Sequence, residues 1–216
     1  MKTDVRKMTA IAMLCAVTYV FMIASKIIPA VEGFLQFDAK DVVITIGGFI
    51  YGPLYAVIIS VIVAFLEFIT VSHTGLIGLV MNIISTAAFS AVAAFVYNRK
   101  KTLSGAFISL ILGTVTLTAV MLLWNYYITP LYMEVPREAV KAMLPTVFLP
   151  FNLVKGIINS GFILFMYRPI VVALQKAGLV ETKEGGKKKI LSLTFAVGII
   201  VVAVFIPVIL IMAGVL

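Results

Sequence analysis

The chain has 216 residues, of which 62% belong to the hydrophobic set AVILMFWYC and 12% are charged, and its formal net charge is +8. Soluble domains contain about 45–50% apolar residues even when Gly is included, and a soluble protein of this size has too much surface to bury the excess. The composition therefore excludes an ordinary soluble enzyme, a disordered chain and a disulfide scaffold, and it predicts an all-α polytopic membrane protein.

Seven apolar runs follow one another along the chain, and a membrane-spanning helix needs about 20 mainly apolar residues. The second run is too short to cross alone, and we expect it to tilt, to extend back through the preceding loop or to be re-entrant. Gly52 and Pro53 mark a turn directly after it. The runs are Met8–Ile28, Val42–Tyr51, Leu54–Val71, Leu76–Tyr97, Leu103–Tyr127, Val147–Tyr167 and Ile190–Leu216.

These runs and the polar segments between them divide the chain into three parts. We expect a six-helix membrane domain over residues 1–172, a basic cytoplasmic linker over residues 173–189 and an additional C-terminal transmembrane helix over residues 190–216. Within the first part, residues 29–41 and 129–145 are polar connections that contain Pro and charged side chains. The last run is long enough to span a bilayer with some tilt.

The basic residues predict the orientation, because Lys and Arg collect in cytoplasmic loops. With the N-terminus in the cytoplasm, 12 of the 17 basic residues fall in inside segments, whereas six of the nine acidic residues fall outside. We attribute the positive charge to this topology, and we expect no binding to nucleic acid. The inside basic residues are Lys2, Arg6, Lys7, Arg99, Lys100, Lys101, Arg168, Lys176, Lys183, Lys187, Lys188 and Lys189.

Motifs for catalysis and metal binding are missing from the sequence. The chain has neither a G-x-x-x-x-G-K-[ST] P-loop nor a G-x-S-x-G nucleophile motif. It contains one His and one Cys, which is too few for a metal site of the usual His/Cys kind. We therefore expect no catalytic residue, no metal and no cofactor, and we predict that the protein is not an enzyme.

Polar residues inside the apolar runs are costly in lipid, so they usually face a cavity or a neighbouring helix. Asn152, Lys155 and Asn159 have the spacing i, i+3 and i+7, which places them on one helical face. Asn82 belongs to a similar polar face in the fourth run. Further amide, hydroxyl and aromatic groups at the end of the fifth run belong to Asn125, Tyr126, Tyr127, Thr129 and Tyr132.

Together these groups predict one pocket in the outer half of the bundle. Amides, hydroxyls and one ammonium suit a neutral, planar, polar small molecule better than an ion, and an aromatic ligand would stack on Trp124, Tyr126 or Tyr132. Purely structural interpretations stay open, because helical Asn and Ser often serve packing and Trp and Tyr often form an interfacial belt. Lys155 can also snorkel to the surface, and Glu67 can be a solvated helix end.

The chain resembles a known family through five landmarks that stand in the same order and spacing. These are the loop FDAKD, the turn GGFIYGPLYA, the helix with Asn82, and the segments NYYITPLY and PFNLVKG. Over about residues 5–172 the chain is similar to the S components of energy-coupling factor (ECF) vitamin transporters, and within them to the riboflavin-specific branch. The last two segments are fairly specific to that branch.

The resemblance implies a protein of the prokaryotic plasma membrane with six membrane helices, which binds one vitamin near the outer surface and has a lid between its first two helices. Riboflavin would be the transported ligand and not a cofactor. Such proteins do not hydrolyse ATP, and they dock on a membrane T component that carries two ATPase subunits. The small-residue step of Ala12 and Ala16 resembles their docking face.

The resemblance also implies roles for individual residues. Asn125, Asn152 and Lys155 match ligand contacts, and Asp41 and Asn82 fall where polar pocket residues are expected. The lid residues that would cover the flavin ring are Phe34, Leu35 and Phe37. The run at residues 190–216 departs from the six-helix pattern of the family.

Two other readings stay open at this point. One is an S component for another vitamin, such as thiamine or folate. The other is a stand-alone ion-coupled carrier, in which Glu67 or Asp41 would titrate as the coupling site.

Overall fold

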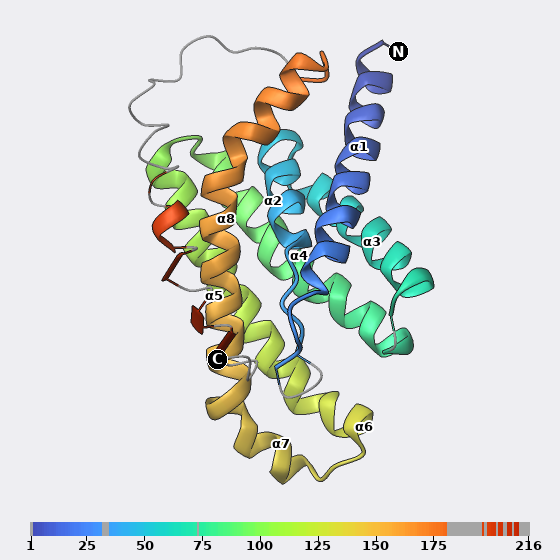
Figure 1. Ribbon diagram of the computed structural model, residues 1–216, viewed down its shortest axis with the longest axis vertical. Coiled ribbons are helices and arrows are strands. Elements are labelled where there is room, and N and C mark those ends of the chain that lie inside the picture. Colours follow the sequence, from blue (N-terminus) through green and yellow to red (C-terminus); the bar gives the residue numbers. More distant parts are fainter. Residues whose placement is uncertain are drawn as a thin grey trace.

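The computed structural model describes residues 2–31, 35–72 and 74–180, together with residues 196, 198–201, 203–204, 207–208 and 210–211. Within these residues the protein is a bundle of helices, and an isolated pair at Val31 and Leu35 is its one β-type contact (Figure 1). The predicted all-α helical bundle is therefore confirmed.

The elements follow the predicted runs closely in the first two thirds of the chain. Five of the described helical segments are long and apolar enough to cross a membrane: Val5–Ser25, Pro53–Thr70, Gly75–Arg99, Leu103–Tyr127 and Arg137–Lys176. The elements are α1 (Lys2–Ser25), α2 (Lys40–Tyr51), α3 (Pro53–Thr70), α4 (Gly75–Arg99), α5 (Leu103–Tyr127), α6 (Thr129–Met133), α7 (Arg137–Met143), a π-helical segment (Leu144–Phe148) and α8 (Leu149–Lys176).

The short helix α2 lies in the middle of the bundle, where it packs against α1, α3, α4 and α8 (Figure 1). All of its residues from Lys40 to Phe49 are buried, which explains why the stretch after Asp41 is almost entirely apolar. Gly48 permits this position, because a Cβ there would lie 2.8 Å from the Cβ of Ala94. Gly52, at φ 106°, then turns the chain directly into α3.

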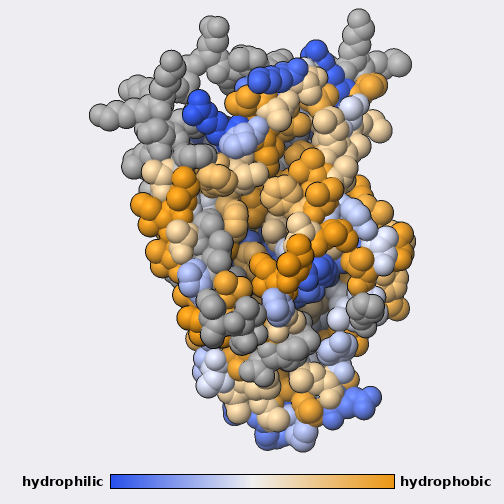
Figure 2. All heavy atoms as spheres, viewed as in Figure 1, coloured by the Kyte–Doolittle hydropathy of each residue, from blue (hydrophilic) through white to orange (hydrophobic). Residues whose placement is uncertain are grey.

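The outer faces of the long helices are apolar, as a lipid environment requires. Large hydrophobic side chains such as Val20, Ile111 and Leu123 are more than half exposed. In Figure 2 the broad middle of the visible face is mostly hydrophobic, and hydrophilic residues gather chiefly towards the two ends. This face therefore has an apolar middle and more polar ends.

The polar connection predicted at residues 129–145 is more ordered than its composition suggests. It contains α6 and α7, which lie at the end of the molecule opposite the N-terminus (Figure 1). Beyond it, α8 runs past the predicted end at Tyr167 to Lys176, so Arg168 and Lys176 lie on a helix and not in a loop. The helix continues through Pro169, and beyond it Leu174 is buried in the cluster around Leu14.

The predicted C-terminal run lies largely outside the described residues. The described residues of this run are helical. They approach α8 closely, because a Cβ on Gly198 would lie 2.8 Å from the carbonyl oxygen of Gly161.

Candidate functional site

A cavity of about 630 Å³ lies between the ends of α1, α3, α4, α5 and α8 and the connection from α1 to α2. Sites for small organic ligands usually have about 300–1,000 Å³. Side chains from α6 and from the α3–α4 turn complete its wall. The predicted site residues that line it are Leu35, Asn82, Asn125, Thr129, Tyr132, Asn152 and Lys155.

The polar row of α8 supplies one wall of this cavity. Asn152 and Lys155 line it, whereas Asn159 lies one turn further on and is fully buried. The amide nitrogen of Asn152 donates to the carbonyl oxygen of Phe148 at 2.8 Å, which leaves its amide oxygen available as an acceptor. The ammonium of Lys155 lies 3.7 Å from the nearer carboxylate oxygen of Asp41, beyond hydrogen-bond distance.

Asp41 lies behind this wall and does not line the cavity itself. Its carboxylate is fully buried and accepts hydrogen bonds from Thr86 at 2.7 Å and from Asn159 at 3.1 Å. We call Asp41, Thr86, Lys155 and Asn159 the Asp41 cluster. Because the cluster joins α2, α4 and α8, it fixes the direction of the Lys155 side chain from behind the cavity wall. The sequence predicts Asp41 as a pocket residue, and in this structure Asp41 affects the pocket only indirectly, through Lys155.

The end of α5 and the start of α6 form a second wall. Thr129 donates to the amide oxygen of Asn125 at 2.8 Å, and the amide nitrogen of Asn125 donates to the carbonyl oxygen of Met121 at 2.7 Å. Trp124 and Tyr132 provide aromatic surface in the same wall.

Tyr126 is not part of the cavity lining, so its predicted ligand contact is not found in this geometry. Its ring stacks edge-on against Tyr127 at 4.9 Å and lies 5.4 Å from the guanidinium of Arg137. Successive side chains on a helix point about 100° apart, so Tyr126 lies about 200° from Trp124 and points away from the side of α5 that carries Trp124 and Asn125.

The three lid residues predicted from the resemblance differ in where they lie. Leu35 is buried and lines the large cavity. Phe37 instead lines a smaller apolar cavity of about 230 Å³ together with Ile28 and Ile158. Phe34 lies outside the described residues.

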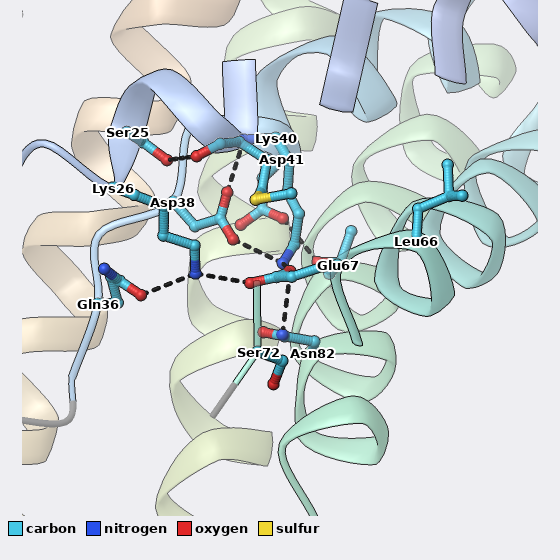
Figure 3. Close-up of polar contacts among 12 residues, drawn as sticks. Ser25, Lys26, Gln36, Asp38, Lys40, Asp41, Leu66, Glu67, Ser72 and Asn82 are labelled. Atoms are coloured by element: carbon cyan, nitrogen blue, oxygen red, sulfur yellow. Dashed lines mark hydrogen bonds and ion pairs between the residues drawn. The ribbon is translucent and has the colours of Figure 1, made fainter. Parts of the chain in front are cut away.

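A group of charged residues was missed by sequence reasoning (Figure 3). The carboxylate of Glu67 is 3% exposed, so its interpretation as a solvated helix end is wrong. One oxygen accepts from Lys26 at 2.7 Å, and the other accepts from Lys40 at 2.6 Å. Asp38, Gln36 and Asn82 complete what we call the Glu67 cluster.

Asp38 ties the connection to the start of α2. One carboxylate oxygen accepts from the backbone N–H of Lys40 at 3.0 Å, and the other pairs with the Lys40 ammonium. Burial alone would raise the pKa of Asp38, but the ammoniums of Lys40 and Lys155 outweigh it, so this pKa lies below its usual value. Asp38 therefore stays ionised beside the Lys40 ammonium.

The arrangement combines apolar and aromatic walls with a few directed polar groups. The cavity-lining charges of Lys26, Asp38 and Glu67 are matched by ion pairs, whereas Lys155 has no hydrogen bond to a described carboxylate. Among the residues that the structure describes, no group of three or more His, Cys, Asp or Glu could hold a metal ion. The site suits an uncharged, flat ligand that carries several hydrogen-bond acceptors.

Comparison with known proteins adds an independent line of evidence. The family described as "ECF transporter, substrate-specific component" matches residues 6–167. The riboflavin transporter FmnP of Bacillus subtilis is 31% identical over 163 residues, which is 71% of this chain and 86% of that protein. The riboflavin transporter RibU of Staphylococcus aureus is 26% identical over 177 residues, or 79% of this chain and 93% of that protein.

A solved structure of the S component of a bacterial ECF transporter has the same fold. It superposes with a TM-score of 0.68 at 26% sequence identity, covering 80% of this chain and 99% of that chain. About one fifth of this chain therefore has no counterpart in that structure.

Proposed function

Because this chain belongs to the family of substrate-specific components of ECF transporters, we propose that it captures riboflavin in the 630 Å³ cavity for uptake driven by a separate ATPase module. The observation that carries the proposal is that Asn152 and Lys155 of one wall and Asn125 of the second wall all line this cavity. Two relatives that align with this chain over most of their own length are riboflavin transporters, which supports this choice of ligand.

The chemistry of riboflavin fits the two kinds of surface in the cavity. Its flat isoalloxazine ring would pack between apolar and aromatic side chains such as Trp124 and Leu35. The ring carbonyls and nitrogens need hydrogen-bond donors, which the Lys155 ammonium supplies, while amide oxygens accept from the ring N–H and the ribityl hydroxyls. The ligand is uncharged, so it leaves the charge balance of the Glu67 cluster unchanged.

A titration of detergent-purified protein tests this assignment. Riboflavin fluorescence should be quenched with a stoichiometry of one, and neither thiamine nor folate should displace it. Displacement by either compound would assign the cavity to that vitamin. If riboflavin itself is not quenched, the proposed ligand is wrong.

The ion-coupled alternative loses its support from the sequence. Glu67 is held by two ammoniums, and Asp41 by two hydrogen bonds and a nearby lysine. A coupling carboxylate has to exchange its cation during transport, whereas these carboxylates already have protein partners.

For the partner, we propose that α1 docks on a membrane T component that carries two ATPase subunits. Ala12 and Ala16 are exposed on one face of α1, next to exposed apolar residues such as Met13 and Val20. Small side chains let a partner helix approach closely. Replacing both alanines by Leu should abolish co-purification with the T component and leave riboflavin binding intact, and unchanged co-purification would contradict the assignment.

We also propose that residues 190–216 form a seventh membrane helix, with residues 173–189 as a cytoplasmic linker that begins on the last turn of α8. The close approach of Gly198 to Gly161 supports helix packing at this point. With a cytoplasmic N-terminus in a prokaryotic plasma membrane, seven spans place the C-terminus outside. A C-terminal alkaline phosphatase fusion should then be active, and a fusion after Val180 should be inactive; the reverse pattern would contradict this topology.

A further inference from the structure

Glu67 occupies a particular place relative to the connection from α1 to α2. Lys26 directly follows the end of α1 at Ser25, and Lys40 is the first residue of α2. Since both ammoniums bind the Glu67 carboxylate, one side chain of α3 fastens both ends of the connection to the bundle (Figure 3). Asn82 of α4 also donates a hydrogen bond to this carboxylate, at 3.2 Å.

The same two lysines also bind residues within the connection. The Lys26 ammonium donates to the side-chain oxygen of Gln36 at 2.8 Å, and Lys40 pairs with Asp38. Gln36 and Asp38 line the large cavity, as do Lys26 and Glu67. The lysines therefore link the cavity side of the connection to the wall formed by α3.

Backbone contacts give the connection little other support. Val31 and Leu35 exchange two hydrogen bonds of 2.9 Å, which close the connection on itself. Among the residues that the structure describes, no backbone hydrogen bond joins this connection to α3, α4, α5 or α8. Apart from apolar packing, the contacts between the described residues of this connection and the cavity wall are thus side-chain ion pairs.

The two ion pairs of Glu67 differ in their access to water. Lys40 is 2% exposed and has two carboxylate partners, whereas Lys26 is 27% exposed and has one. Water and salt compete with an exposed pair much more than with a buried one. The pair between Lys26 and Glu67 is accordingly the one that opens first.

From this geometry we infer that Glu67 and Lys26 form a latch that holds the α1–α2 connection over the cavity and sets the rates of ligand entry and release. Glu67 is a positioning residue: it lines the cavity, but its carboxylate is bonded by Lys26, Lys40 and Asn82, so it acts on the ligand through the connection. The inference rests on the proposed riboflavin function for its kinetic test. It also has a structural test that needs no ligand.

The kinetic test compares Lys26→Met with Lys141→Met, which makes the same change on the exposed face of α7. Riboflavin association and dissociation are followed by stopped-flow fluorescence. A weakened latch should raise both rate constants roughly fivefold, the effect of about 1 kcal/mol. Lys141→Met should keep the wild-type rates.

A lost ligand contact gives a different signature, because it raises the dissociation rate and leaves association unchanged. That result, or unchanged rates in Lys26→Met, would overturn the latch. Glu67→Gln should raise the rates in the same direction, and adding Lys26→Met to it should change them little further, since the pair between Lys26 and Glu67 is already lost. If Glu67→Gln does not fold, the comparison of Lys26→Met with Lys141→Met still tests the latch.

The ligand-free test measures whether the connection opens. Leu35 is buried in the connection, so Leu35→Cys in a Cys15→Ser background places a protected thiol there. Adding Lys26→Met should increase its rate of labelling by a maleimide about fivefold, since the same interaction energy is lost. An unchanged rate would refute the latch even if riboflavin proved to be the wrong ligand, whereas faster labelling without riboflavin binding would refute only the ligand.

Discussion

The two charged clusters beside the cavity are built from similar residues but in different surroundings. The Asp41 cluster joins three helices, and its carboxylate is fully buried. The Glu67 cluster joins helices to a connection, and one of its lysines is partly exposed. A charge network between packed helices holds a side chain in one direction, whereas a network that includes a partly exposed connection can break and reform. The first therefore serves affinity, and the second serves access.

The largest effect should come from breaking the buried network. Asp41→Ala leaves Lys155 without its neighbouring carboxylate and removes the acceptor of Thr86 and Asn159, which should cost about 3–5 kcal/mol of stability. Lys26→Met breaks a partly exposed pair and should cost at most about 1 kcal/mol. Thermal unfolding in detergent measures both. Equal melting temperatures for the two variants would contradict the difference between the clusters.

The next largest effect concerns the amides of the cavity wall. Asn125→Ala removes a proposed ligand contact and the acceptor of Thr129, so it should weaken riboflavin binding about tenfold. Asn98→Ala is the matched control, because Asn98 bonds the Gly48 carbonyl oxygen and does not line the cavity. The control should lower stability but keep the Kd. A weaker Kd in both variants would mean that the loss reflects stability alone.

A smaller effect should distinguish two aromatic residues. Tyr132 lines the cavity and is 40% exposed, whereas Tyr126 packs against Tyr127 and Arg137 outside it. Tyr132→Ala should weaken riboflavin binding about threefold to tenfold, as expected for one aromatic contact. Tyr126→Ala should leave fluorescence titrations unchanged. The opposite ranking would show that the wall at the end of α5 is assigned wrongly.

The smallest effect should come from salt. Raising the ionic strength from about 0.05 to 0.5 M shortens the Debye length from more than 10 Å to about 4 Å, so the rate of riboflavin release should rise about twofold through the exposed Lys26 pair. In Lys26→Met this dependence should disappear. A salt dependence that persists in the variant would place the sensitive pair elsewhere.

How far the sequence predicts this molecule depends on how local each signal is. The bounds of α5 at Leu103 and Tyr127 follow from hydrophobicity alone, and the spacing of Asn152 and Lys155 on one helix predicts their common wall. Tyr126, predicted to contact the ligand, lies outside the cavity lining, because composition near a helix end does not resolve which neighbour turns inward. The Glu67 pairs join residues 41 and 27 positions apart, and no periodic pattern reports such contacts. The presence of acids and lysines near the same end of several runs is the one signal that could have suggested them.

The measurement that tests the central claim most directly is calorimetric titration of riboflavin into the wild type, Lys155→Met and Lys141→Met. Lys155 is the cavity-lining ammonium without a hydrogen bond to a described carboxylate, so its loss should weaken binding by more than about tenfold. Lys141→Met should bind like the wild type. Tight binding that is equal in all three proteins would contradict the cavity as the riboflavin site.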